Sequence, residues 1–224
     1  MFKLYVEEER SLKAICDGNG NEPLIIRKGA WIAGSAPINY RFDKMIFGPG
    51  NSIGEAILGS VRRNLTRENI PLVRVIPNGR SETYYALNAL NVSILNLGRN
   101  DELTVESEYL LAFYDCDYDV KFMGRGMLSQ GGMFTSVLRG KSNNSQVAVV
   151  SNGNVIALET PCACDPDTYI CHTGCDPQIK TDISWKTFIK QHSGETYMFN
   201  FNNRGGMVLI QPSERVGGIH IGID

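Results

Sequence analysis

A segment that occurs three times constrains the fold of this 224-residue chain more than any other feature of its sequence. Residues 110–122 align without gaps on residues 169–181, and this alignment places Cys116 on Cys175. The same segment also aligns on residues 30–42. Because each copy of such a repeat forms one structural unit, the alignment predicts three related units within one chain.

Each copy is followed by an apolar strand, a polar turn and a second apolar strand. The turns are rich in Asn, Gly and Ser, which tolerate the positive φ angles of hairpin loops. Units of this size cannot each bury a sheet face alone, so we expect them to pack around a shared pseudo-threefold axis. The chain is then a single domain with repeats at about residues 1–98, 99–151 and 152–224. The expected first strands are 70–76, 133–138 and 196–201, and each leads through a turn to a second strand, at 92–95, 147–150 and 207–210 respectively.

The composition favours strands over helices. The chain has 23 glycines and many Asn, Asp and Pro residues, which supply turns at short intervals. We therefore predict an all-β fold made of β-sandwich or barrel units. One short helix is expected near residues 52–64, where Ser52 and Glu55 have capping-box spacing and apolar residues follow at every fourth position.

The charge distribution makes a polyanion a poor first guess for the partner. A formal net charge of -2 and a charged fraction of 21% give no strong footprint for nucleic acid or an anionic membrane. Three glutamates, Glu7 to Glu9, stand where an export signal would need apolar residues, and no apolar run approaches the roughly 18 residues of a membrane span. We expect a soluble cytoplasmic protein whose six cysteines are reduced.

Several strand and turn motifs resemble those of a known family. They are Gly29–Ile32, Asp101–Phe113, Gly131–Phe134, Lys180–Phe188, Ser193–Glu195 and Gln211–Glu214. These motifs are similar to those of the altered-inheritance-of-mitochondria twenty-four family, which has bacterial and mitochondrial members. The resemblance implies a triplicated β fold like that of the tryptophan RNA-binding attenuation protein (TRAP), and it links mitochondrial members to inner-membrane organisation. It implies no catalytic residues, because the motifs are structural.

The densest cluster of chemically reactive side chains lies between residues 162 and 175. Cys162, Cys164, Cys171 and Cys175 would supply the four ligands that tetrahedral zinc takes, and His172 lies among them as a further donor. The spacing differs from that of two C-x2-C knuckles, so roles in packing or as oxidisable surface thiols stay open. The cluster also lies in the part of the chain that departs most from the family pattern.

The repeat alignment offers a competing interpretation of one of these cysteines. Cys171 falls on Ala112 and Ile32, and we expect all three positions to face the core. A buried, reduced cysteine packs as a small apolar side chain.

The sequence carries no pattern that predicts catalysis. His192 and His220 have no evident partner, and Arg139–Ser142, which resembles the end of a phosphate-binding loop, lacks the first glycine of that loop and is interpreted as a turn. We therefore expect a non-enzymatic assembly or scaffold protein without a cofactor, an oligomer whose partner is itself or another protein. Peripheral membrane association stays open. The alternative is a metal-binding or redox-sensing module that uses residues 162–175.

Overall fold

The computed structural model describes residues 1–18, 22–35, 40–46, 71–123, 133–181 and 197–213. In these ranges the regular structure is β-strand, apart from two single-turn 3-10 helices, η1 (Ser107–Tyr109) and η2 (Pro166–Thr168). The prediction of an all-β fold is confirmed. The helix expected near residues 52–64 lies outside the described residues. Within the described ranges, no helix has the length and apolar character needed to span a membrane.

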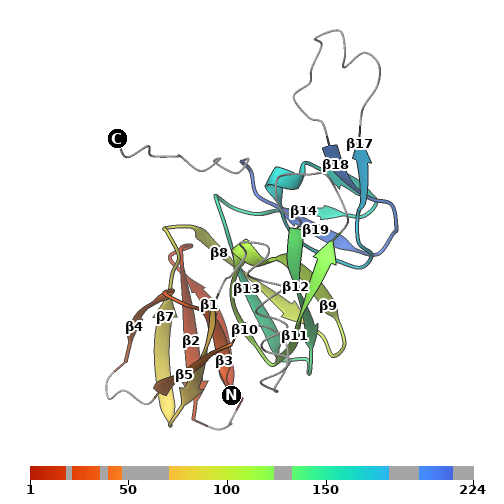
Figure 1. The fold of residues 1–224 in the computed structure, drawn as a ribbon. Coiled ribbons are helices and arrows are strands. Elements are labelled where there is room, and N and C mark those ends of the chain that lie inside the picture. The colour runs from red at the N-terminus through yellow and green to blue at the C-terminus, as the bar shows by residue number, and fades with distance from the viewer. Residues whose placement is uncertain (19–21, 36–39, 47–70, 124–132, 182–196, 214–224) are drawn as a thin grey trace, which may run out of the picture.

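The strands form four antiparallel sheets, with sheet A near one end of the molecule and sheet D near the other (Figure 1). Sheet A contains, in spatial order, β1 (Phe2–Glu7), β2 (Ser11–Asp17), β7 (Arg80–Tyr85) and β4 (Trp31–Gly34). Sheet B contains β5 (Tyr40–Ile46), β6 (Leu72–Pro77), β3 (Leu24–Arg27), β10 (Leu110–Tyr114), β13 (Ser145–Ser151) and β8 (Asn91–Leu97). Sheet C contains β11 (Cys116–Met123), β12 (Met133–Gly140), β9 (Glu102–Glu106), β16 (Tyr169–Thr173), β19 (Met207–Ile210) and β14 (Ile156–Glu159). Sheet D contains β15 (Cys162–Cys164), β18 (Tyr197–Phe201) and β17 (Gln178–Thr181).

The same pairing of strands occurs in three consecutive groups of six. Group one, from β2 to β7, pairs in the orders β2-β7-β4 and β3-β6-β5. Group two, from β8 to β13, pairs as β8-β13-β10 and β9-β12-β11, and group three, from β14 to β19, as β14-β19-β16 and β15-β18-β17. Residues 92–95, expected in the first unit, lie in β8, which pairs with β13 of group two. In group one, β7 is the strand that corresponds to β13 and β19. The residue bounds of the repeats and the pseudo-threefold axis stay predictions.

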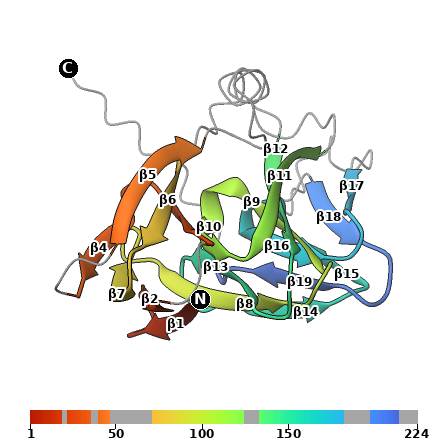
Figure 2. The same ribbon diagram turned by 90° about the horizontal axis from the view of Figure 1, so that it is seen from below.

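Continuous sheets join each group to the next. In sheet B, β3 of group one pairs with β10 of group two, and in sheet C, β9 of group two pairs with β16 of group three. We call these two contacts the junctions. Two strands at the ends of the series correspond to the junction strands: β4 in group one corresponds to β10 and β16, and β15 in group three corresponds to β3 and β9. No described strand pairs with the outer side of β4 or of β15. We call these outer sides the open edges, and Figure 2 shows β4 and β15 at opposite ends of the molecule.

A β-bulge occurs at the same place in each group. The register of β4 against β7, of β10 against β13 and of β16 against β19 shifts at one extra residue. The extra residues are Ile32, Leu111 and Ile170. The bulges therefore make Ile32 the structural equivalent of Leu111. The sequence alignment had placed Ile32 on Ala112, so it was shifted by one residue. Such a bulge raises the local twist of a strand and interrupts regular pairing at one residue.

Burial follows the position of each strand in its sheet. The strands β2 and β7 alternate between buried and more exposed side chains, as expected for strands with one face toward the core. All five residues of β10 are buried. Group three adds a smaller apolar core, in which the Tyr169 ring lies 5.4 Å from that of Phe199 and 6.3 Å from that of Phe201.

Candidate functional site

The four cysteines predicted as zinc ligands are distributed over two sheets. Cys162 and Cys164 lie on β15 in sheet D, whereas Cys171 lies on β16 in sheet C and the exposed Cys175 follows that strand. Across the described ranges, no group of three or more His, Cys, Asp and Glu side chains is close enough to hold a metal ion. Zinc binding by these thiols stays a prediction, which metal analysis of protein purified without chelator would test.

Burial opposes ionisation of three of these thiols. Desolvation raises the pKa of Cys164 and of Cys171 to about 12, and it also raises the pKa of Cys162. The thiolate is the form that binds metals and reacts with oxidants, so these shifts lower the reactivity of all three. Cys171 is fully buried, as the repeat alignment predicts, and packs as an apolar side chain.

His172, the next residue on β16, forms a buried polar network. The Tyr169 hydroxyl donates to the backbone carbonyl of Thr104 on β9 at 3.2 Å, and the same oxygen lies 2.7 Å from Nδ1 of His172. The tautomer of the ring decides which of these two atoms donates to the other, and Nε2 faces the Asp176 carboxylate at 3.5 Å. Burial lowers the pKa of His172 to about 4, so the ring is neutral at pH 7. The network holds β16 against β9 at the second junction.

The sequence did not single out this role of His172. Its partner Thr104 is 65 residues from Tyr169 in the chain, so no local spacing connects them. The available signal was the repeat alignment, which places His172 on Phe113, a buried residue of β10. A polar residue at an apolar position of a repeat indicates a buried hydrogen-bond network.

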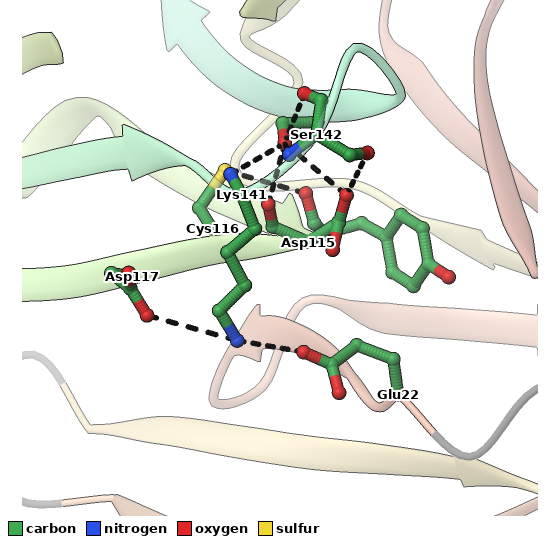
Figure 3. A network of polar contacts seen from close by, with 8 residues as sticks. Glu22, Asp115, Cys116, Asp117, Lys141 and Ser142 are labelled. Carbon is green, nitrogen blue, oxygen red and sulfur yellow. Dashed lines mark hydrogen bonds and ion pairs between the residues drawn. The ribbon is translucent and has the colours of Figure 1, made fainter. Parts of the chain in front are cut away.

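A second polar network fixes the corner where the chain passes between sheets B and C (Figure 3). Asp115 follows β10 with φ of 58°, and its carbonyl accepts hydrogen bonds from Ser145 Oγ at 2.5 Å and from the Lys141 backbone N–H at 3.0 Å. Its carboxylate accepts from Ser142 Oγ. Ser145 Oγ also accepts from the N–H groups of Lys141 at 3.0 Å and Ser142 at 3.2 Å. Of the residues interpreted as a turn, Arg139 and Gly140 end β12, and the turn that begins at Lys141 is tied to the corner after β10.

Lys141 extends this network to group one. Its Nζ lies 2.7 Å from Glu22 Oε1 and 3.8 Å from Asp117 Oδ1, as Figure 3 shows. The hydrogen bond to Glu22 raises the pKa of Lys141, and desolvation, with the Asp115 charge adding to it, raises the pKa of Cys116 to about 12. The lysine is engaged within the protein, which favours a structural role over phosphate binding.

A shallow depression of about 420 Å³ lies over β9, β11 and β12. Its lining carries charges of both signs, and Arg139 Nη2 lies 2.7 Å from Glu102 Oε2 within it. Such a mixed, internally paired lining has no preference for one class of ligand.

β4 is exposed along its whole length although its residues are apolar or glycine. Trp31 is 42% and Ile32 is 53% exposed, so the expectation that Ile32 faces the core is wrong. The reason is that the described part of the chain supplies no strand on the outer side of β4. The Trp31 ring lies 6.0 Å from the ring of Phe42 on β5, which is 47% exposed. We call Trp31, Ile32 and Phe42 the apolar cluster.

These features define an all-β protein whose antiparallel sheets run from one six-stranded group into the next and end at two open edges. The model of the family described as Mitochondrial biogenesis AIM24 matches residues 11–213. The chain belongs to this family, as its strand and turn motifs predicted.

A solved structure has a similar fold. It is the crystal structure of protein SPYM3_0169 from Streptococcus pyogenes, with a TM-score of 0.68 over 96% of this chain and 94% of that chain. The two sequences are 15% identical, so the similarity concerns the fold alone. Among curated proteins no similar sequence was found. The likeness to TRAP stays a prediction.

Proposed function

We propose that this member of the AIM24 family is a non-enzymatic assembly or scaffold protein, which binds another protein chain through the open edge of β4. The observation that carries the proposal is the exposure of the apolar cluster beside that edge. A strand edge presents N–H and C=O groups that can pair with another chain, and aromatic side chains often anchor the centre of protein interfaces. The backbone of β4 can therefore pair with a strand of the partner, while the apolar cluster packs against the partner's side chains.

The chemistry of the other sheet edges supports this choice. Charged residues and covering segments are the usual protection of an exposed edge strand. Of the other edge strands, β8 lies against β1. Apart from β15, the remaining ones each carry a charged residue: Lys3 on β1, Arg41 on β5, Asp117 on β11, Glu159 on β14 and Lys180 on β17. β4, with the sequence WIAG, and β15, with the sequence CAC, carry no charge, and the apolar cluster lies beside β4.

The size of the protein in extracts of the cells that make it tests the proposal. After cross-linking and gel filtration, we expect the wild-type chain in an assembly larger than a monomer. Trp31→Ala removes the largest side chain of the apolar cluster and should return most of the chain to monomer size. Met207→Ala is the matched control, because Met207 on β19 is 44% exposed and lies in another sheet. A wild-type chain that elutes as a monomer would refute the proposal.

A further inference from the structure

The two junctions share one register. Ala112 lies opposite Ile26 in the first junction, and Cys171 lies opposite Val105 in the second. Ala112 and Cys171 each come directly after the bulge residue of their strand. On the partner strands, Ile26 is six residues before the bulge residue Ile32, and Val105 is six residues before the bulge residue Leu111. One geometric rule therefore describes how successive groups join.

The open edges fit the same rule. Ala33 comes directly after the bulge residue Ile32, and Cys164 precedes the bulge residue Ile170 by six positions. A contact between β4 and β15 in the junction register would therefore place Ala33 opposite Cys164. The resulting sheet would run β1-β2-β7-β4-β15-β18-β17, with the three strands of sheet D continuing sheet A.

Burial shows that the open edges lack the neighbour that the junction strands have among the described residues. At the bulge, Leu111 and Ile170 are fully buried, whereas Ile32 is 53% exposed. The partner strands differ in the same way. Thr104 of the junction strand β9 is buried, whereas Ala163, the corresponding residue of β15, is exposed. Neither β4 nor β15 contains a charged residue that would oppose its burial.

We propose that the open edge of β4 in one copy of this chain pairs antiparallel with the open edge of β15 in a second copy, in the register of the junctions. This inference rests on the proposed assembly function and names its partner. The two edges lie at opposite ends of one copy in Figure 2, which favours pairing between copies over pairing within one. Because the two edges differ, the contact is head-to-tail, and repeated contacts close into a ring or continue as a filament.

Two variants block one edge each. Ile32→Lys places a charge on β4 where both junctions bury an apolar side chain, and Ala163→Lys places one on β15 where the junctions bury Ile25 and Thr104. Burial of an unpaired charge is strongly unfavourable, so each variant should weaken its own edge by at least about 100-fold in dissociation constant. Both positions are exposed in the single chain, so the fold should persist. Val6→Lys is the matched control, since Val6 is 43% exposed on β1 at the other edge of sheet A.

Sedimentation of the purified chains measures the contact. Wild type and Val6→Lys should form assemblies whose mass rises with concentration, whereas each blocked variant alone should stay monomeric. An equimolar mixture of the two blocked variants should form dimers and nothing larger, because it contains one intact β4 and one intact β15 per pair. Self-association of the Ala163→Lys chain would instead show pairing of β4 with β4, and a monomeric mixture would show that β4 and β15 do not pair.

Chemical cross-linking tests the register without relying on the lysine variants. Opposite residues on paired strands have Cβ atoms about 4.5–5.5 Å apart, within reach of dibromobimane, a short reagent that bridges two thiols. Burial slows the reaction of Cys164, so the reagent is first attached to Ala33→Cys and the second reaction is followed for hours at pH 9. In a mixture of isotope-labelled and unlabelled chains, the attached reagent is held beside Cys164 of another copy and should be bridged to it. Val6→Cys should give no such product. A bridge from Ala33→Cys to Cys164 within one chain, or to other cysteines alone, would overturn the proposal.

These outcomes separate the inference from the proposed function. A purified wild-type chain that stays monomeric, while the chain in cell extracts is part of a larger assembly sensitive to Trp31→Ala, would overturn the pairing of copies and leave the assembly function standing. A chain that is monomeric in both conditions would overturn both.

Discussion

The junctions and the open edges use corresponding strands and similar residues, yet they differ in burial. β10 and β16 each lie between two neighbouring strands and are almost completely buried. β4 has the same bulge and an apolar sequence, but in the described part of the chain it pairs with β7 alone and all four of its residues are exposed. The difference comes from position in the series of groups and not from residue chemistry. The sequence of β4 thus suits a strand with neighbours on both sides.

The largest expected effect compares the two bulge residues directly. Leu111→Ala creates a cavity at a fully buried position and should lower the free energy of unfolding by about 2–5 kcal/mol. Ile32→Ala changes the corresponding exposed position and should lower it by less than about 1 kcal/mol. Urea unfolding at a dilution that keeps the chain monomeric measures both. Similar losses for the two variants would mean that β4 is covered in the single chain.

A junction also buries an ionisable side chain, His172, where the open edge has Gly34. Burial lowers the pKa of His172 from 6.5 to about 4, although the nearby Asp176 charge acts in the opposite direction. Its neutral form is required in the fold, so the stability it contributes is complete above pH 6.5 and is lost as the pH falls toward 4. The loss amounts to roughly 3 kcal/mol at most.

The variant His172→Gln keeps a polar side chain and removes this titration. Its free energy of unfolding, measured between pH 7 and pH 4, should fall less steeply than that of the wild type. Identical slopes for the two proteins would show that His172 does not lose its proton on folding.

Local signals in the sequence predicted much of the fold. Glycine-rich turns and apolar runs indicated an all-β chain, and the expected strands at 133–138, 147–150 and 207–210 lie within β12, β13 and β19. The strand β7 was not among the expected strands, because Ser81 and Thr83 lie on its buried face and it does not form a continuous apolar run. Alternation with polar buried residues hides such a strand from a search for apolar segments.

The candidate interface could not be predicted in the same way. Whether Ile32 is covered depends on which strand lies beside β4, and that is a property of the whole series of groups. The sequence also drew attention to the four cysteines by their density, whereas the structure separates Cys171 on sheet C from Cys162 and Cys164 on sheet D. Proximity in the chain is a weak guide to proximity in space when consecutive strands alternate between sheets.

The corner beside the first junction should show an intermediate effect. Ser145→Ala removes the hydroxyl that donates to the Asp115 carbonyl and accepts from two backbone N–H groups at a fully buried position. We expect a loss of about 1–3 kcal/mol in the free energy of unfolding, measured in urea. Ser93→Ala on β8 of the same sheet is the control and should cost less than half as much. Equal losses of unfolding free energy for Ser145→Ala and Ser93→Ala would show that the corner network does not stabilise the fold.

The smallest effect concerns the ion pair between Lys141 and Glu22. Both side chains are about two-fifths exposed, and such pairs contribute little in water. Glu22→Gln should lower the free energy of unfolding by less than about 1 kcal/mol at low salt, and the difference should vanish near 1 M salt. A larger loss that persists in salt would give this contact a greater role in joining groups one and two.

Hydrogen–deuterium exchange, read by mass spectrometry on the purified wild-type chain over a range of concentrations, tests the pairing of β4 with β15 most directly. We predict that peptides containing residues 31–34 and 162–164 become protected together as the concentration rises. Peptides containing residues 110–114 and 169–173, which pair at the junctions, should be protected at every concentration. If β4 and β15 exchange at the same rate in dilute and concentrated protein, the open edges do not pair between copies.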